Sequence, residues 1–297
     1  MPMPTDIGVV DTLIGIPNED RRGWYKHFES MLHDEGSKSF EHPAGYMYRE
    51  TPKLKRTPDS ATELLREMDR FGIERGLIAV DPADEMVLAA IRDHPDRLSG
   101  SLMVDPNRGM AAVRDLERAV TELGVVAAQY MPAGVMPPVA INSKLAYPLY
   151  AKCVELDIPV FVNGGVPGPR VPMDSQYPGH VDEVCWFFPE LKFVFRHCCE
   201  PWVDLTIKLM LKWENLYFST TAFAPKYYPR AIIDYANTRG ADKVLYGGYY
   251  PYGLELERIF RELPDLGLKD EVWPKFLREN ALRVFKINEH IAAATGS

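Results

Sequence analysis

The sequence predicts a (β/α)8 barrel, because two patterns alternate along the chain. Short apolar runs without polar alternation are typical of strands buried on both faces of a parallel sheet. Amphipathic stretches separate these runs, and such alternation favours either a barrel or a doubly wound sheet. Eight apolar runs followed by a closing amphipathic segment favour the barrel. The expected strands span residues 8–14, 76–80, 99–104, 125–130, 159–162, 192–195, 216–219 and 243–246.

The expected helices carry apolar residues at three- and four-residue spacing. In residues 61–71, Leu64, Met68 and Phe71 fall on one face, and Ser60 is a suitable N-cap. Residues 270–285 show the same pattern at the end of the chain, and we expect them to seal the barrel. The other expected helices span residues 110–123, 144–156, 203–212, 228–239 and 254–263.

The length is compatible with one large domain. The chain has 297 residues, and dividing by about 150 residues per domain gives two, but (β/α)8 barrels of about 250 residues or more form one domain. Hydrophobic residues make up 46% of the chain, enough for a single large core. We therefore expect one domain over residues 1–297.

The longest expected connection, residues 16–58, separates the first strand from the first helix by about forty residues. Connections of this length are usually functional or disordered. This one is rich in aromatic residues, which favours an ordered lid or a partner-binding surface over a flexible linker. Its aromatic residues include Trp24, Tyr25, Phe28, Phe40, Tyr46 and Tyr48.

The composition argues against several classes of protein. The 34 Lys and Arg against 42 Asp and Glu give a net charge of −8, whereas nucleic-acid binders usually carry a basic face. No apolar run approaches the roughly 18 residues of a membrane span, and the first residues lack the features of a signal peptide. The four cysteines form no CxxC pair and no disulfide framework. We therefore expect that the protein binds no nucleic acid, contacts no membrane and is located in the cytoplasm.

Three segments carry a resemblance to a known family. Residues 191–202 combine an apolar run with His197 and a following Pro-Trp pair, residues 245–251 read Leu-Tyr-Gly-Gly-Tyr-Tyr-Pro, and residues 280–285 read Asn-Ala-Leu-Arg-Val-Phe. In order and spacing they resemble the sixth-strand, eighth-strand and closing segments of the amidohydrolase superfamily. The similarity is greatest to the branch with metal-dependent carboxylate decarboxylases and dicarboxylate lactonases. It implies a (β/α)8 barrel, and because members of this branch are often dimers we expect a homo-oligomer.

The chain departs from the metal-binding pattern of that family. Members typically have His-x-His after the first strand, where this sequence holds Leu13 and Gly15. The resemblance places Asn163 at the fifth-strand histidine and Tyr249 at the eighth-strand aspartate. Leucine and glycine offer no side-chain donor, and neutral asparagine and tyrosine are poor ones. We therefore expect no metal and no other cofactor.

The sixth-strand histidine remains, as His197. Cys198 and Cys199 follow it, so a soft metal site built from these residues is an alternative. Free cysteines are also among the most often buried residues, and simple packing is the competing interpretation.

The catalytic candidates lie at or near the ends of the expected strands, because barrel enzymes place their chemistry at the carboxyl ends of the strands. His197 is the first candidate for a general base, since imidazole titrates near neutral pH, although it also fits a histidine hydrogen-bonded in the barrel mouth. Asp11 and Glu200 are candidates to orient His197 or to act alone. Tyr249 is a candidate donor to a developing oxyanion.

The candidate substrate-binding residues are also near strand ends. Arg196 and Arg170 are expected to pair with a substrate carboxylate. Arg196 has an alternative in which it points outward because its neighbour His197 points inward. Asn163 and Tyr130 are further candidate contacts for a small molecule in the barrel mouth.

Two functions are compatible with these features. The first is a metal-independent hydrolase or lyase acting on a small oxygenated or carboxylate-bearing molecule, which the fold of the resembled family implies. The second is a catalytically silent pseudoenzyme that serves as a binding, assembly or accessory subunit, with residues 16–58 as the surface for a protein partner.

Overall fold

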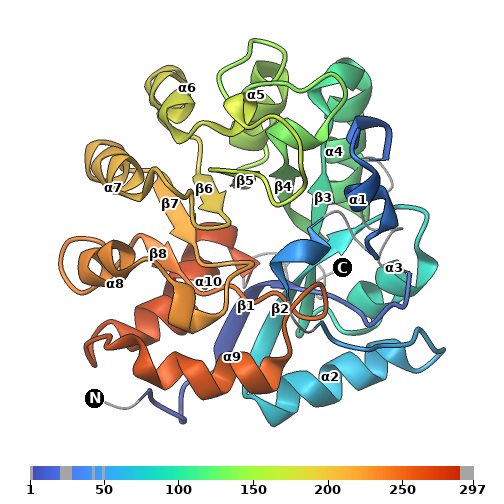
Figure 1. Ribbon diagram of the computed structural model, residues 1–297, viewed down its shortest axis with the longest axis vertical. Coiled ribbons are helices and arrows are strands. Elements are labelled where there is room, and N and C mark those ends of the chain that lie inside the picture. Colours follow the sequence, from blue (N-terminus) through green and yellow to red (C-terminus); the bar gives the residue numbers. More distant parts are fainter. Residues whose placement is uncertain (1–2, 21–28, 42–43, 49–50, 288–297) are drawn as a thin grey trace.

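The computed structural model describes residues 3–20, 29–41, 44–48 and 51–287 (Figure 1). Within these residues, eight parallel strands follow one another in chain order in a single sheet, and helices cover its outer side. The predicted (β/α)8 barrel is confirmed. The strands are β1 (Val9–Ile14), β2 (Ile73–Val80), β3 (Leu98–Met103), β4 (Val125–Tyr130), β5 (Val160–Asn163), β6 (Phe193–Arg196), β7 (Leu216–Ser219) and β8 (Val244–Leu245).

Helices connect the successive strands. The sequence analysis did not predict α3 (Glu85–Asp93) and α6 (Val181–Phe187), although it did predict helices of the same length elsewhere in the chain. Among the described residues, no helix has both the length and the apolar character needed to cross a membrane. The other helices are α1 (Glu35–Ser39), α2 (Ser60–Arg70), α4 (Met110–Glu122), α5 (Tyr147–Glu155), α7 (Val203–Lys212), α8 (Arg230–Ala236), α9 (Leu256–Glu262) and α10 (Asn280–Phe285).

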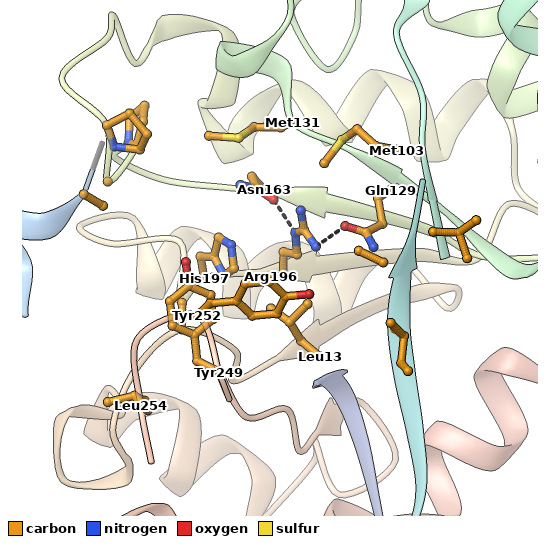
Figure 2. Close-up of a pocket in the computed structure, with 18 of the residues that line it drawn as sticks. Leu13, Met103, Gln129, Met131, Asn163, Arg196, His197, Tyr249, Tyr252 and Leu254 are labelled. Atoms are coloured by element: carbon orange, nitrogen blue, oxygen red, sulfur yellow. Dashed lines mark hydrogen bonds between the residues drawn. The ribbon is translucent and has the colours of Figure 1, made fainter. Parts of the chain in front are cut away.

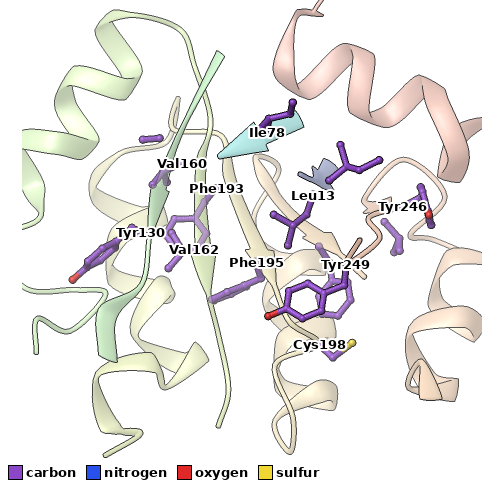
Figure 3. Close-up of a cluster of buried hydrophobic side chains, with 14 of the residues drawn as sticks. Leu13, Ile78, Tyr130, Val160, Val162, Phe193, Phe195, Cys198, Tyr246 and Tyr249 are labelled. Atoms are coloured by element: carbon purple, nitrogen blue, oxygen red, sulfur yellow. The ribbon is translucent and has the colours of Figure 1, made fainter. Parts of the chain in front are cut away.

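The larger hydrophobic core lies between the strands and the surrounding helices. Val160 and Val162 on β5 belong to it, as do Phe193 and Phe195 on β6 (Figure 3). All four side chains are buried. The inward faces of the same strands start with apolar residues as well, which explains why these strands show no polar alternation in the sequence.

The interior of the barrel changes from apolar to polar along the strands. Phe161 and Val194 lie in an apolar cluster with residues of α10, which seals this end of the barrel. Because side chains on one face of a strand recur every second residue, Asn163 and Arg196 face the interior one layer further along β5 and β6. The polar layer is therefore at the carboxyl ends of the strands.

The barrel is closed by few backbone contacts between β8 and β1. Ile14 and Tyr250 form an isolated parallel bridge, and the Gly15 N–H donates to the Tyr250 carbonyl at 2.9 Å. With only two residues in β8, side-chain contacts are needed to hold this seam.

The described part of the 16–58 insertion packs on the loop that follows β5. The Tyr46 hydroxyl donates to the Gly168 carbonyl at 2.8 Å. Arg170 forms an ion pair with Asp34 at 2.6 Å, and its guanidinium carbon lies 4.9 Å from the centre of the Tyr46 ring. Of the aromatic residues noted above, Trp24, Tyr25 and Phe28 lie outside the described residues.

Candidate functional site

A pocket opens at the carboxyl ends of the strands, as expected for a (β/α)8 barrel. Its cavity measures about 1490 Å³ and extends from the polar interior layer to the rim at Asp81, Arg108 and Arg258. The residues at its inner end come from β1, β4, β5, β6 and the loop after β8 (Figure 2). They are Leu13, Gln129, Asn163, Arg196, His197, Tyr249 and Tyr252.

Arg196 lies inside the barrel, so the outward alternative considered from the sequence is wrong. Its Nε donates to Asn163 Oδ1, and its Nη1 donates to Gln129 Oε1 at 2.7 Å. The guanidinium carbon is 5.2 Å from the centre of the Phe161 ring below it. The side chain is only 4% exposed. Two amide oxygens and an aromatic face thus fix the orientation of a buried positive charge at the inner end of the pocket.

The segment after β6 has an unusual backbone. His197, Cys198 and Cys199 have φ angles of +67°, +61° and +54°. Left-handed conformations cost non-glycine residues roughly 1–3 kcal/mol each and concentrate at functional sites. Gly164 and Gly165 allow this segment to approach β5, since an added Cβ would lie 2.6 Å from Cys199 Sγ and 2.7 Å from the Cys199 backbone, respectively.

The imidazole of His197 lines the pocket and contacts two neighbours. Its Nδ1 is 3.1 Å from Thr221 Oγ1, and its ring meets the Tyr249 ring edge to face at 5.9 Å between centres. Burial, together with the nearby Arg196 charge, holds the pKa of His197 well below its usual value. The ring is therefore a neutral imidazole at physiological pH.

Three tyrosines form an aromatic wall of the pocket. The Tyr249 ring lies 5.6 Å from the Tyr252 ring and stacks on Tyr48 of the insertion at 5.9 Å with an interplanar angle of 23°. Burial raises the pKa of the Tyr48 and Tyr252 hydroxyls above their usual value. These phenols therefore keep their protons and are able to donate hydrogen bonds.

Asp11 was a catalytic candidate, and the structure places it beside the pocket, in the seam of the barrel. Its carboxylate accepts from the Gly248 N–H at 2.8 Å, from the Leu13 N–H at 2.9 Å and from the Tyr246 hydroxyl at 3.4 Å. It is fully buried and is not among the described residues that line the pocket. Burial raises its pKa from 3.8 to about 6, because desolvation outweighs these hydrogen bonds. Asp11 thus joins β1 to the loop after β8, where the strand ladder is weakest.

The structure spreads the remaining candidates over three places. Glu200 is exposed at the rim of the pocket. Tyr130 is buried in the outer core, and its hydroxyl donates to the Val139 carbonyl. Arg170 binds the insertion through Asp34, as described above, and does not line the pocket. Of the sequence candidates, His197, Arg196, Asn163 and Tyr249 therefore meet at its inner end.

Residues that the sequence analysis did not select complete this site. Gln129 binds Arg196, and the alternation along β4 that turns Tyr130 outward turns Gln129 inward. That alternation was a usable signal. Thr221 and Tyr252 come from loops. Side chains in loops do not alternate in direction as they do in strands, so no comparable signal exists for these two residues.

The side chains at the first two metal-ligand positions do not suit a metal. Leu13 has no donor atom. A Cβ at Gly15 would lie 2.7 Å from the Tyr252 hydroxyl, so this ring occupies the space that a second histidine needs. At the third position, Asn163 Oδ1 is already engaged by Arg196.

The other potential ligands do not compensate for this loss. The Tyr249 ring packs between Tyr48 and Tyr252, and a tyrosine is a poor replacement for an aspartate ligand. Burial raises the pKa of the Cys198 and Cys199 thiols far above their usual value, so they are poor thiolate ligands. Within the described ranges, no cluster of three or more His, Cys, Asp or Glu side chains is placed to hold a metal ion. The residues present do not fit the divalent metal that the family resemblance implies.

Fold and site together define a (β/α)8 barrel protein with a polar pocket at the carboxyl ends of its strands. The sequence model of the amidohydrolase family matches residues 16–287, nearly the whole chain. This protein belongs to the amidohydrolase family. A search of curated protein sequences found no match.

Several solved structures share this fold. An uncharacterised TIM-barrel protein from Bordetella bronchiseptica has a TM-score of 0.71 at 22% identity, over 95% of this chain and 100% of that chain. A 5-carboxyvanillate decarboxylase from Novosphingobium aromaticivorans, solved with manganese and a nitrobenzoic acid, has a TM-score of 0.65 at 16% identity, over 95% and 97%. A 4-oxalomesaconate hydratase from Rhodopseudomonas palustris has a TM-score of 0.62 at 19% identity, over 97% and 98%. At these identities the similarity shows the fold.

Proposed function

We propose that this protein is a metal-independent lyase or hydrolase acting on a small molecule that carries a carboxylate. The observation that carries the proposal is the guanidinium of Arg196 at the inner end of the pocket, beside His197. A guanidinium supplies a permanent positive charge and paired donors for a carboxylate. The names of the decarboxylase and hydratase above, which refer to carboxylates, agree with this substrate class.

The surroundings of Arg196 suit such a role. Asn163 and Gln129 hold the guanidinium through neutral amide oxygens, so these two contacts orient it without cancelling its charge. Because the side chain is 4% exposed, little water screens its attraction for an anion that enters the pocket.

The remaining walls of the pocket suit the uncharged part of the same molecule. The Tyr249 and Tyr252 rings and the Leu13 side chain offer apolar and aromatic surface near Arg196 and His197 (Figure 2). Aromatic surfaces bind flat bodies well, and a phenol at the edge is able to donate to a substrate oxygen. The site therefore favours a compact, flat carboxylate that lies with its charged end toward Arg196.

Binding of benzoate and benzamide, followed by titration calorimetry, tests the charge requirement, since the two ligands have nearly the same shape. We expect benzoate to bind at least tenfold more tightly than benzamide. Arg196→Met should weaken benzoate binding by about 10- to 100-fold, the loss typical of a charged hydrogen-bonded contact, and remove the preference. The matched control is Arg92→Met, because Arg92 is a 64% exposed arginine on α3. It should change neither the affinity for benzoate nor the preference for benzoate over benzamide.

Turnover of a panel of aromatic and aliphatic carboxylates in the presence of a chelator tests the catalytic part. We expect at least one substrate to react, with the rate unaffected by chelator and lost in His197→Gln. Equal binding of benzoate and benzamide, or turnover that requires added metal, would contradict the proposal. Benzoate binding without turnover of any substrate would overturn the enzyme assignment in favour of a binding or accessory subunit.

A further inference from the structure

One buried hydroxyl makes two contacts with the same histidine. Thr221 Oγ1 lies 3.2 Å from the backbone nitrogen of His197, which donates to it, and 3.1 Å from His197 Nδ1. The Thr221 side chain is fully buried. Among the described residues, Thr221 Oγ1 has no hydrogen-bond partner outside His197.

The hydrogens of this pair have one satisfactory arrangement. A threonine hydroxyl has one hydrogen to donate and two lone pairs to accept with. The His197 N–H uses one lone pair. If Nδ1–H also donated to Oγ1, the Thr221 hydrogen would be buried without an acceptor, which is costly. If the Thr221 hydroxyl instead donates to Nδ1, every group is satisfied, and the imidazole proton is on Nε2.

The environment also opposes a doubly protonated ring. Arg196, the preceding residue, places its positive charge next to the imidazole, and the His197 side chain is partly buried. The ring also lies within reach of the Thr221 backbone, and Nε2 is the ring nitrogen that Thr221 Oγ1 leaves for the pocket. His197 would thus present one N–H toward the cavity into which Arg196 also points (Figure 2).

We infer that Thr221 is a positioning residue that fixes His197 as the neutral Nε2–H tautomer, so that His197 donates a hydrogen bond to a substrate oxygen next to Arg196. The part about substrate rests on the proposed function. In this arrangement neither ring nitrogen has a lone pair available to remove a proton from a bound molecule. His197 then stabilises negative charge on an oxygen, together with Arg196, in place of the general base expected from the sequence.

Nuclear magnetic resonance of the full chain labelled with ¹⁵N-histidine tests the tautomer directly. Long-range ¹H–¹⁵N correlations distinguish Nε2–H from Nδ1–H rings, and His197→Gln identifies the His197 signals by their loss. We expect the Nε2–H pattern in the unliganded wild-type protein and in Thr221→Ser, which keeps the hydroxyl. Thr221→Val should give a mixture of tautomers or the Nδ1–H form.

Thr220→Val is the matched control, because this adjacent threonine is equally buried and contacts Gly247 instead of His197. It should retain the Nε2–H pattern. An Nδ1–H ring in the wild-type protein, or an Nε2–H ring that persists in Thr221→Val, would overturn the inference.

Ligand binding separates this inference from the proposed function. Thr221→Val should weaken benzoate binding by about tenfold, as expected for one displaced donor, and Thr221→Ser should restore it. If benzoate does not bind the wild-type protein although the Nε2–H tautomer is found, the proposed function fails and the tautomer assignment stands. If benzoate binds and Thr221→Val leaves both its affinity and the tautomer unchanged, the positioning role fails alone.

Discussion

Among the described residues of the barrel strands, two charged side chains are buried, Arg196 on β6 and Asp11 on β1, with exposed fractions of 4% and 0%. Arg196 binds side-chain amides and faces the pocket. Asp11 accepts from backbone N–H groups and holds the seam between β1 and the loop after β8. Arg196 is the last residue of β6, whereas Asp11 lies within β1, and both carry functional groups used in catalysis. The difference teaches that the contacts of a buried charge, more than its residue type, decide whether it is available to a ligand.

The largest predicted effect concerns the stability contributed by Asp11. The pKa of this carboxyl is about 6 in the folded protein against an ordinary value of 3.8. A raised pKa favours the folded state most fully below the ordinary value, and this stabilisation is lost as pH rises through about 6. Relative to Asp11→Asn, the wild-type free energy of unfolding should therefore fall by on the order of 3 kcal/mol between pH 4 and pH 7.

Urea denaturation of both proteins across this pH range measures that difference. Comparison with Asp11→Asn cancels the contributions of other carboxyl groups. Parallel stability curves for the two proteins would show that the ionisation of Asp11 is not coupled to folding. Benzoate affinity should be the same in both within about threefold, because the carboxylate does not line the pocket.

A smaller effect is expected when a carboxylate like that of Asp11 is introduced at the inward-facing end of β5. Asn163→Asp would place a carboxylate next to the Arg196 Nε atom that Asn163 now accepts from. The new ion pair should neutralise the guanidinium charge. Benzoate binding should therefore weaken by about 10- to 100-fold, without unfolding of the protein. Asn215→Asp, which adds the same charge at a partly exposed position away from the pocket, is the control for calorimetry. Unchanged affinity in Asn163→Asp would mean that the anion binds elsewhere.

The smallest effect is predicted for Arg170, which the sequence suggested as a substrate contact. Its guanidinium is paired with Asp34, and both side chains are partly exposed, at 46% and 39%. Solvent screens such a pair, so its loss should affect the packing of the insertion only slightly. Benzoate affinity in Arg170→Ala should stay within about twofold of the wild-type value. A tenfold loss in the same calorimetric titration would return Arg170 to the binding site.

The sequence predicted the barrel well because strands buried on both faces have a distinctive composition. The same property concealed the site. In runs such as 125–130, which are mostly apolar, the alternation shows which residues share a face but not which face points inward, and a shift of one residue exchanges the two faces. Tyr130 was chosen for its chemistry, whereas Gln129 faces the interior.

The direction of Arg196 illustrates a second limit. The argument that Arg196 and His197 must point to opposite sides assumes that the strand continues through both residues. The strand ends at Arg196, and the left-handed backbone at His197 turns its side chain into the same pocket. Such a conformation depends on the space left by Gly164 and Gly165 on the neighbouring strand's loop. A single stretch of sequence does not contain that information.

Benzoate titration of chelator-treated protein, with and without added manganese, is the most direct test that Arg196 provides the cationic part of this site. The dissociation constant should be the same in both conditions, because the charge that holds the ligand is part of the chain. Binding that appears only after manganese is restored would contradict the assignment and require metal ligands that the described residues do not provide.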